Sequence, residues 1–318
     1  MDFGVATSTR GALGNREGYI AVTERAEKLG FGFISVNDHV IVPRDIASRY
    51  PYSESGEWAG RAVGECLDQL STLAFLAGRS ERLRLLTSVM VVPQRHPVLT
   101  AKMLATIDVL SNGRLIVGCG VGWLQKEFEA LGAPPYAERG RATDEFLDAF
   151  KLLWTEDAPK LNGKHVRFDD IIFEPKPVSK PHPPIWIGGE SPQALKRTVR
   201  VGDGWYPASN NPQHRLDTPE RLAAGVSELR RVAEAAGRDP GSIDVGYLVL
   251  WPVDWAEQKG VDGGRRLLTG RSQDIAADID ALERAGVRHL CLTFQTASLP
   301  ETLNRMQRFA EEVMPLAR

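Results

Sequence analysis

Short apolar runs alternate with stretches of helical periodicity along almost the whole chain of 318 residues. The apolar runs fall at residues 3–6, 31–36, 83–92, 115–119, 185–187, 203–206, 243–250 and 289–293. Alternation of this kind predicts parallel strands with a helix after each, because parallel neighbours need a crossover connection. We therefore expect an α/β fold, a single (β/α)8 TIM barrel domain over residues 1–318, with insertions in the loops at the C-terminal face of the strands. An open doubly wound sheet with a second domain is the alternative, because residues 155–183 break the pattern.

The expected helices are marked by a one-sided apolar pattern and by their end residues. Gly30 stands where a left-handed cap belongs, and Ser191 and Pro192 stand where an N-cap and a first helical residue belong. We expect helices at 16–29, 66–78 and 97–110, one opened by Trp123, one at 143–154, one from Pro192, and others at 219–236, around 275–282 and at 299–313. Residues 40–63 are rich in Pro, Ser, Gly, Tyr and Trp and have no clean period, which indicates a lid or binding loop.

Charge and cysteine content narrow the class of protein. The 39 basic residues are scattered and nearly balance the 41 acidic ones, which argues against nucleic acid as a partner. No basic and apolar signal segment and no apolar run of about 20 residues stands out, so we expect a cytoplasmic protein without a membrane partner.

The cysteines Cys66, Cys119 and Cys291 are far apart and odd in number, which favours buried thiols over disulfides. Cys119 lies at a strand end, but no His or Asp motif accompanies it as a nucleophile would require. The six histidines form no H-E-x-x-H motif and no pairing with cysteine, so a metal site is not expected.

The stretch LSNGRLIVGCGVGWLQKEFEALG, residues 110–132, is the most informative single segment. It is an apolar strand that ends in alternating glycines, Gly118, Gly120 and Gly122, and then enters a helix. A dinucleotide fingerprint would need a glycine where Trp123 stands, and it normally follows the first strand. The segment therefore predicts a ligand site at the carboxyl end of a strand without the nicotinamide signature.

In a barrel all strand ends face one mouth, and their polar and aromatic residues would meet there. The residues concerned are Asp38, His39, Ser88, Arg95, Trp123, Gly188, Gly189 and Trp205. Two tryptophans, several glycines and a histidine favour a planar aromatic ligand with hydrogen-bonding edges. The Gly188–Gly189–Ser191 segment offers backbone N–H groups to a phosphate, or is only a tight turn; the charge of Glu190 must then point away.

Several of these residues have two open interpretations. His39 could transfer a proton near neutral pH, or could be a buried histidine bonded to backbone, while Asp38 could orient a neighbour or hold the loop. Glu127 could bind a ligand or add a favourable charge at a helix start. Thr87 and Ser88 interrupt an apolar strand, so they are satisfied by neighbouring backbone or mark a bulge that touches a ligand.

Five segments resemble the luciferase-like flavin or deazaflavin oxidoreductases, the bacterial luciferase superfamily. They are NDH at 37–39, TSVMVVPQRHP at 87–97, LSNGRLIVGCGVGWLQKEF at 110–128, KPHPPIWIGGESP at 180–192 and GDGWYP at 202–207. The chain looks most similar to the class assigned to coenzyme F420, a deazaflavin, and flavin-using relatives carry similar motifs. The resemblance implies a (β/α)8 barrel that binds coenzyme F420, or alternatively FMN, at its mouth.

The resemblance also implies roles for individual residues. Ser88 and Val89 would form a bulged third strand behind the tricyclic ring, often with a non-prolyl cis peptide; Gly188 and Gly189 would meet the phosphate, and His39 would lie near the redox face. The implied cofactor-binding set is Asn37, Ser88, Val89, Gly120, Val121, Gly122, Trp123, Glu127, Gly188, Gly189 and Trp205. The segments at 40–63, 155–183 and 251–270 would shape the substrate pocket.

The expected activity is hydride transfer between coenzyme F420 and a small organic carbonyl, alcohol or alkene, with His39 and Asp38 as catalytic residues. The alternatives are a monooxygenase that uses FMNH2 and oxygen, and a non-catalytic flavin-binding barrel. The resemblance further implies a homo-oligomer. Coenzyme F420 carries an anionic oligoglutamate tail, and a set of loop arginines either converges on it or is ordinary solvated surface: Arg10, Arg44, Arg49, Arg61 and Arg95.

Overall fold

Parallel strands close into a barrel in the computed structural model of the chain, which describes residues 1–58 and 66–317. In barrel order the strands are β3 (Arg84–Thr87), β2 (Phe33–Val36), β1 (Asp2–Thr7), β11 (His289–Thr293), β10 (Asp244–Pro252), β9 (Gly204–Tyr206), β8 (Ile185–Gly188), β5 (Leu115–Gly120) and β4 (Met90–Val91). The β3–β5 pairing, which joins Leu85 to Leu115, closes the ring. β3 and β4 share one position in it, because they are two parts of the third strand. The predicted (β/α)8 barrel is thus confirmed, and the open sheet is excluded.

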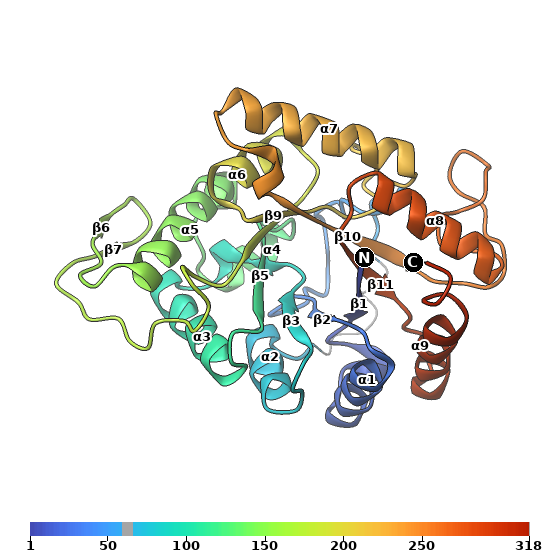
Figure 1. The fold of residues 1–318 in the computed structure, drawn as a ribbon. Helices are drawn as coiled ribbons and strands as arrows, with labels where there is room; N and C mark the ends of the chain where they lie inside the picture. The colour runs from blue at the N-terminus through green and yellow to red at the C-terminus, as the bar shows by residue number, and fades with distance from the viewer. Residues whose placement is uncertain (59–65, 318) are drawn as a thin grey trace.

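Helices form an outer layer around this barrel (Figure 1). In the described residues they are α1 (Arg16–Leu29), α2 (Gln69–Ala77), α3 (Pro97–Leu110), α4 (Gln125–Ala130), α5 (Arg139–Thr155), α6 (Pro192–Val201), α7 (Pro219–Ala235), α8 (Ser272–Arg284) and α9 (Leu299–Glu312). Two predicted capping residues are confirmed. Gly30 ends α1 in the left-handed conformation, at φ 82°, and the Ser191 side chain accepts a hydrogen bond from the Ala194 N–H at the start of α6.

Some predicted boundaries were wrong, each for a local reason. α2 begins at Gln69 and not at Cys66, because the Asp68 side chain caps it by accepting from the Ser71 N–H. α4 begins at Gln125 rather than at Trp123, and α5 begins at Arg139, before the apolar pattern that marked it. The segment at 155–183 contains a small hairpin, β6 (Leu161–Asn162) and β7 (Arg167–Phe168), that no periodicity announced.

Apolar side chains fill both sides of the strands. Inside the barrel a small cluster packs around Phe33, Leu86, Ile116, Trp186 and Tyr206, and a larger one lies between the strands and the helices. Burial on both faces explains why the strands are nearly continuous apolar runs. Among the helices of the described residues, none combines the length and the apolar composition of a membrane-spanning segment.

A charged cluster lies at the N-terminal ends of β1, β10 and β11. His289 Nδ1 is 3.3 Å from Asp2 Oδ2, its Nε2 is 3.9 Å from Asp244, and Arg84 pairs with Asp2. Burial lowers the pKa of His289, but its hydrogen bond to Asp2 and the nearby Asp244 carboxylate outweigh burial and leave that pKa raised. This charged cluster contributes to the stability of the fold and not to a ligand site, because ligands of a barrel bind at the opposite end.

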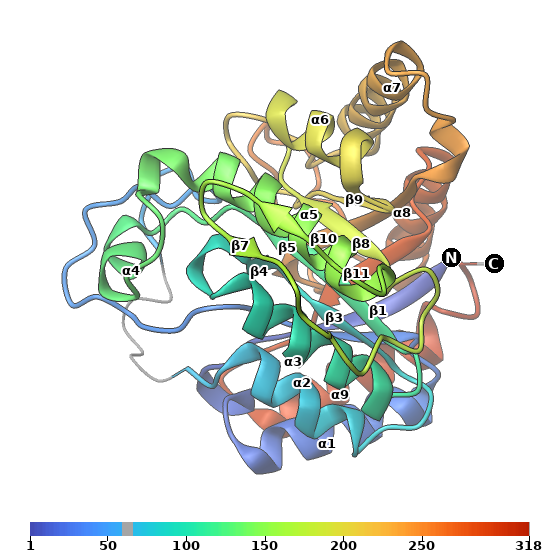
Figure 2. The same cartoon turned by 90° about the vertical axis from the view of Figure 1, so that its left-hand side faces the viewer.

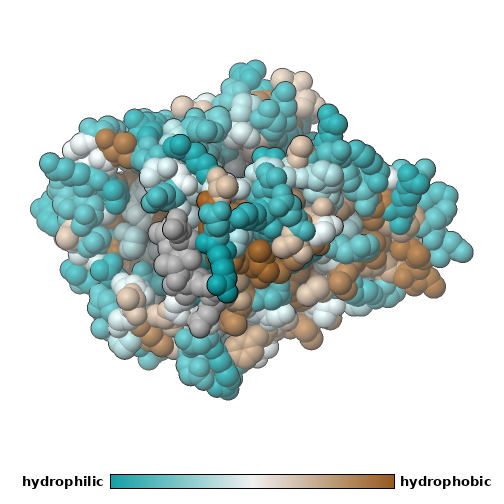
Figure 3. Space-filling view, turned by 180° about the vertical axis from the view of Figure 1, so that it is seen from behind, coloured by the Kyte–Doolittle hydropathy of each residue, from teal (hydrophilic) through white to brown (hydrophobic). Residues whose placement is uncertain are grey.

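The opposite end carries the long loops. In Figure 2 the two chain termini lie at one end of the barrel, and α4 with the segment after β2 lies at the other. Figure 3 views this second end, where brown apolar residues are exposed near the middle of a mostly hydrophilic face. The carboxyl ends of the strands therefore open on a partly apolar hollow.

Candidate functional site

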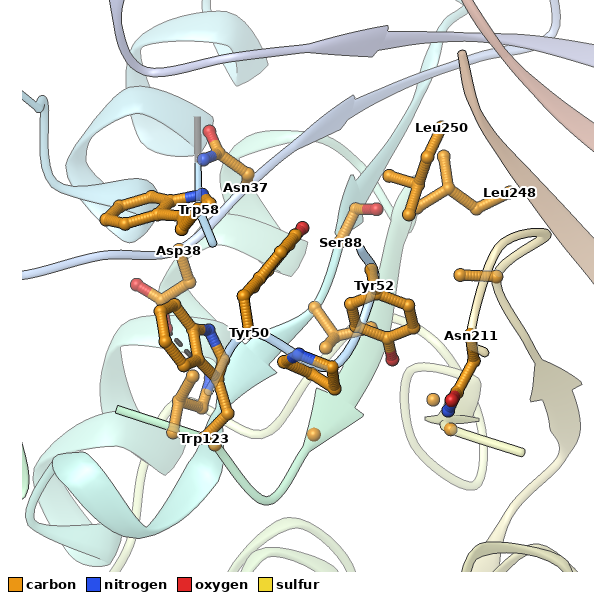
Figure 4. Close-up of a pocket in the computed structure, with 18 of the residues that line it drawn as sticks. Asn37, Asp38, Tyr50, Tyr52, Trp58, Ser88, Trp123, Asn211, Leu248 and Leu250 are labelled. Atoms are coloured by element: carbon orange, nitrogen blue, oxygen red, sulfur yellow. Dashed lines mark hydrogen bonds between the residues drawn. The ribbon is translucent and has the colours of Figure 1, made fainter. Parts of the chain in front are cut away.

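A cavity of about 840 Å³ opens at the carboxyl ends of the strands, and Figure 4 shows part of its lining. Twelve of the thirteen residues predicted for catalysis or cofactor binding line it: Asn37, Asp38, His39, Ser88, Val89, Gly120, Val121, Gly122, Trp123, Glu127, Gly188 and Gly189. They come from loops after β2 and β5, from the break between β3 and β4, and from the end of β8. Residues remote in sequence therefore meet at one mouth, as the barrel requires.

Trp205 is the exception, because its side chain is not in the cavity lining. The ring is 1% exposed and lies in the core outside the barrel, against Leu216 and α7. Side chains alternate along a strand, so its neighbour Tyr206 faces the barrel interior instead. Trp205 still supports the site, since its Nε1–H donates a 2.9 Å hydrogen bond to the Gly189 carbonyl.

The break in the third strand forms one wall of the cavity. The Ser88–Val89 peptide is cis, as the resemblance implied, and Ser88 Oγ shares a 3.0 Å hydrogen bond with Tyr206 Oη. The Val89 side chain fits between two glycines: a Cβ at Gly120 would lie 2.6 Å from Val89 Cγ2, and a Cβ at Gly188 would lie 2.9 Å from Cγ1. These glycines therefore make room for Val89, and their absent side chains do not by themselves indicate contact with a ligand.

His39 is paired with Glu127 and is not bonded to backbone. Nδ1 of His39 is 3.3 Å from Glu127 Oε2, and Glu127 Oε1 accepts hydrogen bonds of 2.7 and 3.2 Å from the N–H groups of Val40 and Ile41. Burial alone would raise the pKa of Glu127, but the His39 contact and these hydrogen bonds hold it below its usual value. Because Nδ1 faces an ionised carboxylate, it carries a proton there, and Nε2 is the ring nitrogen left for a ligand.

Asp38 is a positioning residue in this structure. Its two oxygens accept 2.7 Å hydrogen bonds from Nη1 and Nη2 of Arg95, and Oδ2 also accepts from the Val91 N–H at 2.8 Å. Arg95 reaches Asp68 as well, at 3.3 Å. The Asp38 carboxylate is thus fully engaged, so it holds β4 and the loop after β2 and is not placed for proton transfer.

Of the four described arginines that were expected near an anionic tail, Arg10 and Arg49 line the cavity, and Arg44 and Arg95 do not. Arg95 is neutralised by its carboxylates, and Arg44 is exposed and absent from the cavity lining. Arg10 and Arg49 do line the cavity; the Arg10 guanidinium lies 4.1 Å from the centre of the Trp58 ring, and Arg49 donates to the Glu54 carbonyl. Arg61 falls outside the described residues.

The end of β8 fits a phosphate group. Gly189 has φ 104°, a conformation that favours glycine, and it leads into the N-terminus of α6, where backbone N–H groups attract anions. Arg139 lines the cavity and hydrogen-bonds the carbonyls of Gly122 and Tyr136; among described residues it has no ion pair. Its charge is therefore available to an anionic ligand.

Glu190, whose charge should disfavour a phosphate, lines the cavity, but both of its carboxyl oxygens are engaged by hydrogen bonds. Its oxygens accept 2.7 Å hydrogen bonds from the Ala208 N–H and from Asn211 Nδ2. Burial raises the pKa of Glu190 against the effect of these bonds, so the carboxyl is harder to ionise. Glu190 consequently ties the segment after β9 to the end of β8 and leaves the backbone N–H groups to the cavity.

The cavity also presents a buried amide side chain. Gln94 is 6% exposed and lines the cavity; among the described residues its amide makes no hydrogen bond of normal geometry, although it lies close enough to Glu127 to help lower the pKa of that carboxyl. A ligand with a donor and an acceptor on one edge would complete the hydrogen bonds of this amide. A tricyclic flavin or deazaflavin with a phosphate therefore fits the residues present.

Sequence reasoning did not identify the aromatic lining supplied by the segment after β2. Tyr50, Tyr52 and Trp58 line the cavity, and the Trp58 ring centre is 4.5 Å from that of His39. The composition of residues 40–63 indicated a lid, but without a periodic pattern the sequence does not show which of its side chains face the cavity.

Cys119 is buried, and burial raises the pKa of its thiol, which argues against its acting as a nucleophile.

Fold and site together define a (β/α)8 barrel with a cavity at the carboxyl ends of its strands, lined by aromatic side chains, glycines and Arg139. Residues 1–259 match the family model described as luciferase-like monooxygenase. The chain therefore belongs to the luciferase-like family, whose members are oxidoreductases and monooxygenases.

Relatives and solved structures similar to this chain include both FMNH2-dependent and F420-dependent enzymes. The chain is 30% identical over 278 residues to an uncharacterized protein of Mycobacterium tuberculosis, covering 85% of this chain and 93% of that one. It is 37% identical over 190 residues to the FMNH2-dependent dimethylsulfone monooxygenase of Pseudomonas putida, covering 59% of this chain but only 50% of that enzyme. In structure it is similar to monooxygenase RslO1 of Streptomyces bottropensis (TM-score 0.75, 24% identity, 99% of both chains). It is equally similar to an F420-dependent secondary alcohol dehydrogenase (TM-score 0.76, 18% identity, 100% and 99%), so the fold does not separate the two cofactors.

Proposed function

We propose that this protein is an oxidoreductase that moves a hydride between coenzyme F420 and a small organic carbonyl or alcohol. The observation that carries the proposal is the His39–Glu127 pair in the wall of the cavity. A carbonyl that receives a hydride at carbon must receive one proton at oxygen, and the reverse reaction must release one.

The residues divide the work of holding the cofactor. The Ser88–Val89 wall supports the ring, Gln94 satisfies a polar edge, and the Gly188–Gly189 segment with Arg139 receives the phosphate. When bound, coenzyme F420 supplies two electrons and a hydrogen as hydride. Glu127 fixes the His39 ring so that Nε2 exchanges the proton with substrate, which is worth about 10²–10⁴ in rate for a well-placed acid or base.

An FMNH2-dependent monooxygenase is the second candidate, supported by the 37% identity to the Pseudomonas putida enzyme over 190 residues. The same wall and phosphate site suit FMN, so the cofactor decides between the two. Homo-oligomer formation is part of the proposal and is read from the sedimentation of the purified protein.

Titration of the purified protein with coenzyme F420 and with FMN tests the proposal. We expect tight binding of F420, weak binding of FMN, and no uptake of oxygen when the reduced cofactor is present, because deazaflavins react poorly with oxygen. Arg139→Met should weaken binding of the intact cofactor but not of its phosphate-free form, which checks the assigned phosphate site. Tight FMN binding with oxygen consumption would refute the F420 assignment and support the second candidate.

A further inference from the structure

The aromatic segment after β2 supplies a second proton-bearing group to the cavity that His39 lines. Tyr50 lines the cavity, and in Figure 4 its side chain projects from the loop into the open middle of the cavity. Its hydroxyl makes no hydrogen bond to any described residue, whereas the hydroxyls of Tyr136, Tyr206 and Tyr247 are each bonded. The Tyr50 hydroxyl is therefore a donor that faces the ligand space and has no protein partner in the described part of the chain.

Three aromatic side chains pack around the Tyr50 ring. The Tyr50 ring meets Trp123 edge-on with 5.1 Å between ring centres, lies 6.3 Å from Trp58, and contacts Tyr52 at 5.7 Å. Trp58 and Trp123 are also the neighbours of His39, at 4.5 and 6.3 Å. Tyr50 and His39 thus pack on the same pair of indole rings, and both residues line the cavity.

We infer that Tyr50 is a catalytic residue that donates a hydrogen bond to the oxygen of an aromatic or cyclic ketone, which His39 then protonates. The inference rests on the proposed function for its chemistry. The hydride from the reduced deazaflavin forms a C–H bond at the carbonyl carbon, the C=O electron pair moves to oxygen, and His39 supplies the proton. The ketone becomes a secondary alcohol, the cofactor is oxidised by two electrons, and solvent restores the proton of His39.

The surroundings of Tyr50 support a donor that keeps its own proton. Burial raises the pKa of Tyr50 to about 12, although the charge of Arg10 acts to lower it, so the phenol stays neutral at physiological pH. The flat substrate body is indicated by the lining itself: indole and phenol rings on one side, and Leu248 and Leu250 on the other (Figure 4).

The test compares two probes of the same shape, acetophenone and its oxygen-free counterpart ethylbenzene, by titration calorimetry on the wild type and on Tyr50→Phe. Loss of a hydrogen bond between neutral groups should weaken acetophenone binding about 3- to 10-fold. Ethylbenzene binding should not change, because the phenylalanine ring keeps the packing. With the bound cofactor reduced, turnover of acetophenone should fall about 10- to 100-fold, since the hydrogen bond strengthens as charge grows on oxygen.

Tyr52→Phe is the matched control, because it removes a hydroxyl from the same segment on the side of the cavity near Asn211 (Figure 4). Its effect on acetophenone should be smaller than that of Tyr50→Phe. Equal losses in both variants, equal losses for both probes, or a wild type that binds neither probe would each overturn the inference. The probe titration uses no cofactor, so a failure of F420 to bind would refute the proposed function while leaving the Tyr50 result readable.

Discussion

Replacing Gly120 by alanine tests what the glycines at the strand ends are for. The added Cβ would lie 2.6 Å from Val89 Cγ2, closer than two carbon atoms normally approach, so β5 or the Val89 side chain must move. Overpacking of this size costs about 1–3 kcal/mol. With an unfolding entropy of about 2.1 cal/mol/K per residue over 318 residues, we expect Tm to fall by about 1.5–4.5 °C.

The partner in this contact can be removed separately. Val89→Ala deletes the methyl that the new Cβ would meet, so Gly120→Ala should cost at least about 1 kcal/mol less in the Val89→Ala background than in the wild type. Thermal unfolding of the four proteins measures this coupling. Gly78→Ala is the control, because its nearest neighbour would be 3.8 Å away and its backbone is right-handed helical, so its effect on Tm should be small.

Cofactor binding by the double variant separates two roles for Gly120. If the glycine only makes room for Val89, the double variant binds cofactor as Val89→Ala alone does. If the backbone must also approach the cofactor closely, as the sequence suggested, binding stays impaired after the clash is relieved. A cost of Gly120→Ala that is the same in both backgrounds would refute the packing argument.

Three further outcomes follow from the pairs described above. Asp38→Asn removes the carboxylate that both Nη atoms of the partly buried Arg95 contact and leaves Arg95 only its 3.3 Å contact with Asp68, so it should lower the free energy of unfolding by about 1.5–3 kcal/mol, measured in urea; a loss under 1 kcal/mol would contradict the assigned role. The raised pKa of His289 stabilises the fold fully below the ordinary value of 6.5, and that stabilisation is lost as pH rises through the folded-state pKa. His289→Gln should therefore lower Tm at pH 6 more than at pH 9, and an equal loss at both would refute the linkage. His39→Asn should slow hydride transfer by about 10²–10⁴ while cofactor affinity is unchanged, measured by stopped-flow absorbance; an unchanged rate would remove His39 from the chemistry.

The barrel could be predicted because its signal is repeated along the chain. Each strand is a short apolar run, and each helix has its own caps, as Gly30 and Ser191 illustrate. The boundaries that were wrong lie where a single side chain decides them, such as Asp68 at the start of α2. A local capping contact leaves no periodic trace, so the pattern could place the helix but not its first residue.

The site was predictable where residues sit at strand ends and not where they sit in loops. Position after β2 and β5 was enough to bring Asp38, His39 and Gly122 into one cavity. Their bonding was not predictable, because the ion pair of Asp38 with Arg95 joins residues 57 positions apart. The side chain of Trp205 was expected in the cavity for a different reason. Strand β9 has only three residues, too few for the alternation of apolar and polar residues to show which side chains face the barrel interior.

The division between strand ends and loops has a functional consequence. The strand ends hold groups that any cofactor of this shape needs, namely the Ser88–Val89 wall and the glycines of β8, and packing fixes them in the barrel. In the proposed function the substrate side is built from loop residues such as Tyr50, which lies outside the strands and helices of the barrel. Selectivity for substrate can therefore change without loss of the cofactor site. It follows that Tyr50→Phe should alter which ketones bind while leaving cofactor affinity and Tm close to those of the wild type. Gly120→Ala should instead lower Tm and cofactor affinity and leave the choice among ketones unchanged.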